Sequence, residues 1–184
     1  VIVGGVLIVG IGTAGGTVIG GPIGMNSGNT AVGAIIGAAV GGTAGGLMGN
    51  NMDKQAAELK EDLKGARVER VGEGIKITFD SGLMFGYDSY SLNSSTKASL
   101  LDLGTILNKY EDTNILIEGH TDASGKDDYN MGLSRKRATA VASYLGVNGV
   151  KASRVSTKGY GESQPISSVD AANRRVAVAI YANK

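Results

Sequence analysis

A short run of residues, Gly119-His120-Thr121-Asp122, places an acidic side chain directly after an apolar segment. Asp122 is therefore expected just past the end of a strand, where open α/β sheets bind their ligands. Arg137 follows on a predicted helix, in line with Leu133 and Val141 on the side that faces the core. A guanidinium there should not be buried alone, so it must meet a carboxylate from the protein or from a ligand. Spacing alone favours the first alternative, an Asp122–Arg137 salt bridge.

Other kinds of chemistry find little support in the side chains present. The chain has 184 residues, no cysteine, one histidine and a formal net charge of +1. These values exclude disulfide scaffolds, thiol nucleophiles, thiolate metal sites and the basic surface of nucleic-acid-binding proteins, and they disfavour a metal site built from histidines. His120 has no serine nucleophile motif near it, and Asp127-Asp128 offers too few oxygen ligands for calcium. Gly159-Tyr160-Gly161 lacks the third glycine of a dinucleotide site. We therefore expect no enzyme activity, no metal and no cofactor.

The last two thirds of the chain show the patterns of an α+β domain. Two alternating segments around Gly72-Glu73-Gly74 predict a β-hairpin, and an apolar segment before His120 predicts an inner strand. Helical spacing of apolar residues predicts two amphipathic helices. The order β-α-β-α-β-β, with helices between strands, indicates a mixed sheet covered by helices. The expected strands are 67–71, 75–79, 114–119, 154–159 and 175–181, and the expected helices begin at Ser94 or Ser95 and span about 128–145.

The first 52 residues differ from the rest because they contain no Asp, Glu, Lys or Arg and hold 17 of the 30 glycines. Two series of glycines recur every four residues, which brings them to one face of an α-helix. Such a face permits the close helix packing found in membranes. The pattern predicts a hairpin over 1–52, with arms near 2–25 and 31–52, that is membrane-associated or self-associating, and Pro22 should interrupt the first arm. The glycines are Gly12, Gly16, Gly20, Gly24 and Gly28, then Gly33, Gly37, Gly41, Gly45 and Gly49.

Residues 53–66 have the composition of a helix that ends near Gly65. Ala56, Leu59 and Leu63 fall on one side of it, which makes the segment amphipathic. We expect a helical linker that continues the second glycine-rich arm and leads to a domain at 67–184.

The residues from about 75 to 182 carry several motifs in a fixed order, and together they resemble the OmpA-like peptidoglycan-binding domain. The glycine series running into Met52-Asp53-Lys54-Gln55 is similar to the front of outer-membrane lipoproteins that carry such a domain. The motifs are Gly119-His120-Thr121-Asp122 with Gly125; Asn130 with Leu133-Ser134 and Arg137-Ala138; Gly159-Tyr160-Gly161-Glu162 with Pro165; and Asn173-Arg174-Arg175-Val176.

The resemblance implies binding to the peptide stem of the bacterial cell wall through its diaminopimelate. In that family the position of Asp122 receives the ligand's ammonium, and that of Arg137 receives its carboxylate. A carboxylate suits a cation, and the planar guanidinium can hold a carboxylate with two hydrogen bonds. Arg174 is expected to be only solvated, and Gly86 stands where many members have Asp. The remaining positions implied to lie at the site are Thr121, Asn130, Asp88 and Arg175.

The resemblance also implies a place in the cell: a non-catalytic anchor in the outer membrane, with its wall-binding domain in the periplasm. Its partners would be peptidoglycan and the membrane, without nucleic acid. The alternative is an assembly subunit of a cell-envelope complex, whose glycine-zipper helices mediate oligomerisation or docking. The lipidated cysteine of such lipoproteins is absent from this sequence, so we expect it on an upstream segment. A motor stator subunit is disfavoured, because 1–52 has no ionisable residue to carry protons through a membrane.

Overall fold

The computed structural model of the chain describes residues 47–183. The first predicted glycine-rich arm, and the second as far as residue 46, lie outside the described residues. The helices are α3 (Leu47–Asp62), α4 (Ser81–Met84), α5 (Ser94–Lys109), α6 (Asp127–Val147), the short 3₁₀ helix η1 (Ala152–Arg154) and α7 (Asp170–Asn173). The strands are β1 (Ala66–Val71), β2 (Gly74–Asp80), β3 (Thr113–His120), β4 (Val155–Gly159) and β5 (Arg175–Ala182).

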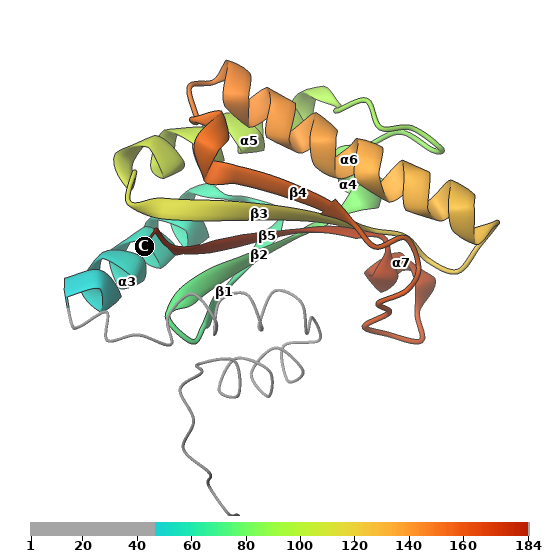
Figure 1. Cartoon of the computed structure of the whole chain (residues 1–184), viewed down its shortest axis with the longest axis horizontal. Helices are drawn as coiled ribbons and strands as arrows, with labels where there is room; N and C mark the ends of the chain where they lie inside the picture. Colours follow the sequence, from blue (N-terminus) through green and yellow to red (C-terminus); the bar gives the residue numbers. More distant parts are fainter. Residues whose placement is uncertain (1–46, 184) are drawn as a thin grey trace, which may run out of the picture.

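The five strands form one mixed sheet in the order β1-β2-β5-β3-β4. β3 and β4 are parallel and are joined through α6, because parallel neighbours need a crossover connection. The other neighbouring strands are antiparallel. This arrangement confirms the predicted α+β class and its mixed sheet, and Figure 1 shows the twisted sheet with its helices.

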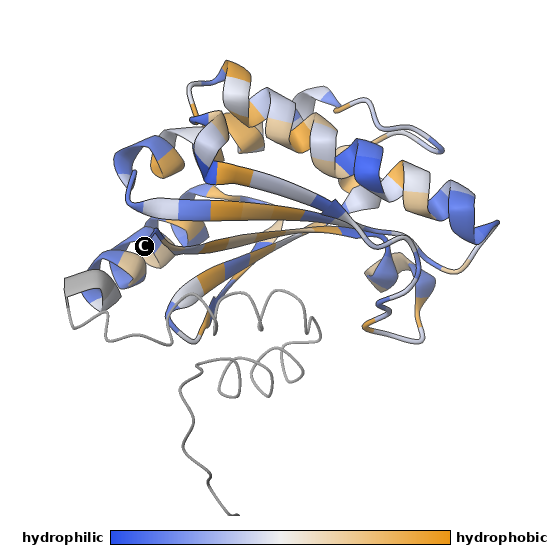
Figure 2. Ribbon diagram, in the orientation of Figure 1, coloured by the Kyte–Doolittle hydropathy of each residue, from blue (hydrophilic) through white to orange (hydrophobic). Residues whose placement is uncertain are grey.

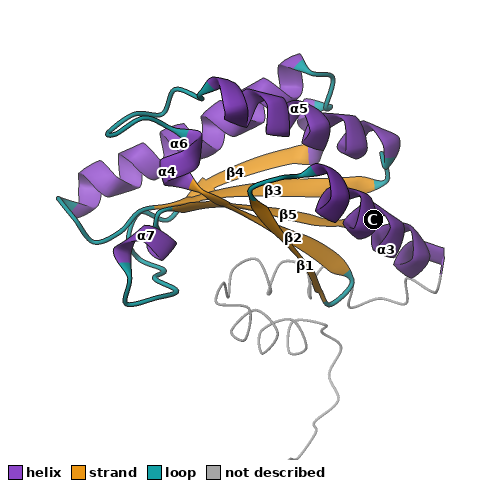
Figure 3. Ribbon diagram, turned by 180° about the vertical axis from the view of Figure 1, so that it is seen from behind, coloured by secondary structure: helices purple, strands orange, loops and turns teal. Residues whose placement is uncertain are grey.

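The longer helices α3, α5 and α6 lie on one side of the sheet (Figures 1 and 3). Every second residue of the inner strands points toward them and is buried, as the two-residue period of a strand requires. Figure 2 shows the hydrophobic residues concentrated along these strands. The buried strand residues of this core include Ile75, Ile77, Phe79, Ile115, Ile117, Val176, Val178 and Ile180.

The segment that we expected to be a linker contributes to this core. α3 buries Met52, Ala56 and Leu59 in the same hydrophobic cluster as the sheet, and Leu63, directly after the helix, joins them. The apolar stripe read from the sequence therefore packs onto the domain, and the folded unit extends before residue 67. Among residues 47–183, no helix has both the length and the apolar character needed to cross a membrane.

The register of the strands brings several chain segments to one end of the sheet. Arg175, at the start of β5, pairs with both Asp80 at the end of β2 and His120 at the end of β3. The loop after β3 and the beginning of α6 lie at this end, whereas α3 begins near the opposite end (Figures 1 and 3). The predicted strand ends therefore meet at one edge, and the polar residues that follow them are brought together.

Two glycines allow α6 to lie very close to this edge of the sheet. Gly119 of β3 and Gly159 of β4 are paired across the parallel ladder. A Cβ atom at Gly119 would lie 2.1 Å from the backbone oxygen of Ser134, and one at Gly159 would lie 2.4 Å from Cγ of Arg135. Because no side chain fits in either place, both positions require glycine, and α6 is held against β3 and β4.

Candidate functional site

A cavity of about 690 Å³ opens at the end of the sheet where the strands converge. Its walls come from the loop after β3, the first half of α6, α4 with the segment that follows it, and the residue before β5. Five of the six predicted site residues line it, namely Asp88, Thr121, Asp122, Asn130 and Arg137. The sequence prediction is therefore consistent with a single concave site.

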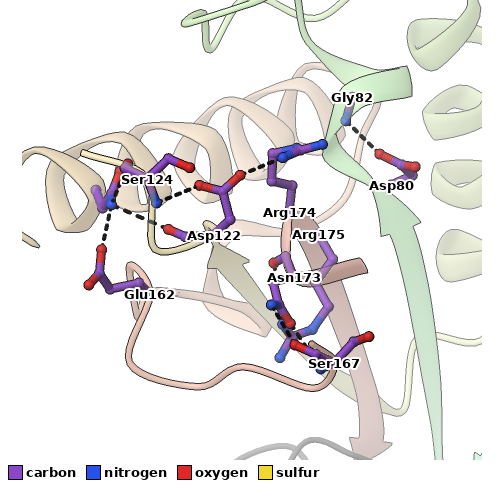
Figure 4. A network of polar contacts seen from close by, with 10 residues as sticks. Asp80, Gly82, Asp122, Ser124, Glu162, Ser167, Asn173, Arg174 and Arg175 are labelled. Carbon is purple, nitrogen blue, oxygen red and sulfur yellow. Dashed lines mark hydrogen bonds and ion pairs between the residues drawn. The ribbon is translucent and has the colours of Figure 1, made fainter. Parts of the chain in front are cut away.

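Asp122 lies on the wall of this cavity with only 9% of its side chain exposed. Oδ1 accepts a hydrogen bond of 2.9 Å from the backbone N–H of Ser124, and Oδ2 accepts one of 2.5 Å from Nη1 of Arg174 (Figure 4). Burial alone would raise the pKa of this carboxyl group, but the hydrogen bonds from Arg174 and Ser124 outweigh burial and hold the pKa below its usual value. Asp122 is therefore an ionised acceptor at neutral pH.

Arg137 is buried on the side of α6 that faces the sheet. Its Nε donates a 3.0 Å hydrogen bond to the backbone oxygen of Ser89, and its guanidinium carbon lies 5.1 Å from the centre of the Phe85 ring. Burial lowers the pKa of Arg137, but an arginine stays charged at neutral pH. Among the described residues, no carboxylate oxygen lies within 4 Å of this guanidinium, so the Asp122–Arg137 salt bridge favoured by spacing alone is not formed.

Asp88 lies on the rim of the cavity, in the segment between α4 and α5. It has a positive φ of 52°, which an aspartate tolerates better than most residues do. The hydroxyl group of Tyr129 donates a hydrogen bond to its carboxylate. A bridge between Phe85 and Leu92 closes the base of this segment. The rim is thus tied to α6 through two contacts, Tyr129 to Asp88 and Arg137 to Ser89.

Asn130 and Thr121 fix the loop that carries Asp122. The side-chain amide of Asn130 donates to the backbone oxygen of Ser124 at 3.0 Å and to Oε2 of Glu162 at 2.6 Å. The backbone N–H of Thr121 donates to the oxygen of Gly161 at 2.8 Å. Both residues line the cavity, yet these contacts position Asp122.

The two neighbouring arginines at the entry to β5 are placed differently from the prediction. Arg175, expected at the site, is buried away from the cavity and donates hydrogen bonds to the backbone oxygens of Gln164 and Asn173. Burial lowers its pKa to about 10. Arg174, expected to be only solvated, lines the cavity and pairs with Asp122. Figure 4 shows Arg174 turned toward Asp122 and Arg175 turned away, because consecutive residues entering a strand point to opposite sides.

The lining residues that sequence reasoning did not assign to the site include Ser124, Tyr129 and Arg174. Ser124 acts through its backbone N–H, which every residue type offers. Tyr129 stands one residue before the recognised Asn130, but exposed tyrosines are common on helices. Neither had a signal in the sequence that would mark it as part of a site.

Comparison with known proteins assigns the chain to a family. The model of the OmpA family matches residues 84–178, about half of the chain, and a glycine-zipper model matches residues 11–56. The chain belongs to the OmpA family, and a glycine-zipper segment precedes its OmpA-like domain.

Among its relatives is the probable lipoprotein YiaD of Escherichia coli K12, 36% identical over 136 residues that cover 70% of this chain and 62% of YiaD. The peptidoglycan-associated lipoprotein of Buchnera aphidicola is 32% identical over 118 residues, covering 64% of this chain and 65% of that protein. The chain thus spans somewhat less than two thirds of either relative. Among solved structures, the cell wall anchor of the T6SS from Pseudomonas aeruginosa matches with a TM-score of 0.62 and 28% identity, over 70% of this chain and 97% of that one.

Proposed function

We propose that this chain is a non-catalytic anchor that binds peptidoglycan through the diaminopimelate of its stem peptides. The observation that carries this proposal is the pair of charged groups on one cavity wall. Asp122 is a nearly buried anion, and Arg137 is a buried cation with no carboxylate within 4 Å among residues 47–183. A buried guanidinium is costly without an anionic partner, and an incoming carboxylate would supply one.

The chemistry of diaminopimelate fits this pair. In a stem peptide its side chain ends in an ammonium and a carboxylate on one carbon atom, which is a compact zwitterion. Nε of Arg137 is occupied by Ser89, so the two terminal nitrogens remain to bind a carboxylate in a fork. Asp122 can accept the ammonium. A lysine side chain at the same position of the stem has the ammonium but lacks the carboxylate, so Arg137 would distinguish the two wall types.

Names of the relatives support the same assignment, since they include peptidoglycan-associated lipoproteins and a cell wall anchor. We infer that the glycine-zipper segment lies on the membrane side and that the OmpA-like domain faces the periplasm. Asp88 and Tyr129 would form the outer rim through which the stem peptide enters.

The test is cosedimentation of the full chain with purified diaminopimelate-type sacculi, with free meso-diaminopimelate and free lysine as competitors. Asp122→Asn and Arg137→Lys should each weaken binding by at least about tenfold, because each leaves one charge of the ligand unpaired. Asp102→Asn and Arg67→Lys, at exposed positions, are the matched controls. If both site variants still bind the sacculi and melt at the wild-type temperature, the proposed function is wrong.

A second function, assembly through the glycine zipper, rests on the match of the zipper model to residues 11–56. We propose that this segment also associates with itself or with another envelope protein. Replacing Gly33, Gly37 and Gly41 by leucine in the full chain would fill the glycine face and should abolish crosslinked oligomers. If oligomers persist unchanged, the zipper is not the element that holds them.

A further inference from the structure

Asp122 already has a cation in this structure, and that cation belongs to the chain itself. Arg174 donates from Nη1 to Oδ2, while the backbone N–H of Ser124 occupies Oδ1. The two partners of the ion pair differ strongly in exposure, with 9% of the Asp122 side chain exposed and 43% of the Arg174 side chain. The acid is fixed in the wall, whereas the guanidinium reaches it from a side open to water.

An ammonium group that binds Asp122 competes with Arg174 for the same negative charge, because both oxygens of the carboxylate already accept a hydrogen bond. Two cations on one carboxylate oxygen would repel each other in a partly buried place, where charge interactions are stronger than in water. Arg137 adds a third positive charge on the same cavity. Sharing Asp122 between Arg174 and the ligand is therefore unfavourable, and one of the two must leave.

Arg174 has other anions to move toward. Asp170 and Asp80 both act electrostatically on it, and together with its hydrogen bond to Asp122 they raise its pKa. In Figure 4 the Asp80 side chain is drawn near the Arg174 guanidinium, and Oδ1 of Asp80 accepts only the backbone N–H of Gly82 there. A half-exposed arginine between several carboxylates loses little when it exchanges one for another, since exposed ion pairs contribute little.

We propose that Arg174 is a built-in competitor for the ammonium subsite, which occupies Asp122 until the ligand's amino group displaces it. This inference rests on the proposed function and adds a determinant of selectivity to it. A ligand that brings only an amine must displace Arg174 for a single ion pair. A zwitterionic ligand gains Arg137 as well, and this second contact offsets the displacement. Arg174 thus makes the site select for ligands that carry both charges.

The experiment is titration calorimetry of the full chain with meso-diaminopimelate and with pentane-1,5-diamine, an amine without a carboxylate. Arg174→Gln should bind meso-diaminopimelate about three- to tenfold more tightly than wild type, as expected for removing an ion pair with one half-exposed partner. Its preference for meso-diaminopimelate over the diamine should shrink. Arg174→Lys keeps a competing cation and should stay near wild type, and Arg67→Gln, at an exposed pair with Glu69, is the matched control.

A pH profile separates this role from a merely structural one. Without Arg174 the pKa of Asp122 rises, so binding by Arg174→Gln should be lost on acidification at a higher pH than in wild type. If folded Arg174→Gln binds more weakly than wild type or equally well, and wild type binds normally, then Arg174 does not compete with the ligand. The proposed function would be unaffected by this result. If wild type does not bind meso-diaminopimelate, both the proposed function and this inference are wrong.

Discussion

Two buried arginines of this domain have opposite surroundings. Arg154 donates hydrogen bonds to three backbone oxygens and one hydroxyl group where α5 ends and β3 begins, at 2.7 to 2.9 Å. Arg137 has one such bond, to Ser89. A guanidinium that donates through all three nitrogens is part of the structure, whereas one with both terminal nitrogens to spare on a cavity wall is suited to a ligand.

Replacing these two arginines should therefore affect different properties. Arg154→Lys should lower the free energy of unfolding by about 2–4 kcal/mol, because one ammonium cannot reach all the acceptors. Arg137→Lys should leave stability nearly intact and weaken wall binding by at least about tenfold. Urea denaturation followed by circular dichroism measures the first effect, with Lys151→Gln at an exposed ion pair as control. Equal losses of stability in both variants would contradict this division.

His120 predicts a dependence of stability on pH. It is buried, stacks on Tyr160 with ring centres 5.3 Å apart, and has a pKa that burial lowers from 6.5, with Glu118 acting in the opposite direction. The unfolded chain therefore takes up this proton more readily than the folded chain does. The free energy of unfolding should decline as the pH falls through about 6.5, and the decline should end below the folded-state pKa.

The measurement is urea denaturation at a series of pH values between 8 and about 4.5, with His120→Gln beside wild type. The difference in the free energy of unfolding between wild type and His120→Gln should vary with pH in this window only. Asp122 titrates below it, since its pKa is lowered from 3.8. A constant difference would show that the folded domain does not resist protonation of His120.

At the scale of elements, periodic segments were predictable and short ones were not. The predicted strands 67–71, 75–79 and 114–119 correspond to β1, β2 and β3, since alternation over several residues is a strong signal. The four-residue helices α4 and α7 have too few residues to show a period. The first residue of the predicted strand 154–159 belongs to η1 instead.

Within the site, residue type could be predicted and orientation could not. Asp122 and Arg137 share a cavity as predicted, because strand ends and helix faces follow from periodicity. The choice between Arg174 and Arg175 depends on a register of one residue at the entry to β5. A shift of one residue exchanges the two sides of a strand, and the sequence around this turn has no pattern that sets it.

The close approach of α6 to the sheet gives a test at this scale. Gly159→Ala would place a Cβ atom 2.4 Å from Arg135 Cγ and 2.6 Å from its backbone nitrogen. We expect a loss of about 2–3 kcal/mol of stability from this overpacking. Gly132 lies on α6, where an added Cβ atom meets open space, so Gly132→Ala should gain about 1 kcal/mol of stability from helix propensity. Urea midpoints of both variants check the prediction, and equal shifts would argue against tight packing at Gly159.

At the scale of the whole molecule, the limits of the folded unit depend on α3. A chain beginning at residue 67 lacks Met52, Ala56, Leu59 and Leu63, which are part of the core. It should unfold without a cooperative transition, whereas a chain beginning at 47 should melt sharply. Thermal scans by circular dichroism distinguish the two, and a sharp transition in the shorter chain would show that α3 is dispensable.

A single substitution in α3 measures the contribution of this helix to stability without removing the helix. Leu59 is completely buried, so Leu59→Ala should cost about 3 kcal/mol. Lys60→Ala, one residue on and exposed, should change stability by less than about 0.5 kcal/mol. Denaturation of both by urea provides the comparison. Similar values would mean that α3 packs only loosely on the sheet.

The loop after β3 and the beginning of α6 line the cavity, and they lie at the opposite end of the sheet from the start of α3 (Figure 1). In an anchor of the kind proposed, a pull between envelope layers would enter through α3 and leave through a stem peptide held beside α6. Such tension would act along the strands and load their ladders in shear, across many hydrogen bonds at once, since those bonds run perpendicular to the strands. A domain attached in this direction would resist mechanical stretching better than one whose ladders open one bond at a time.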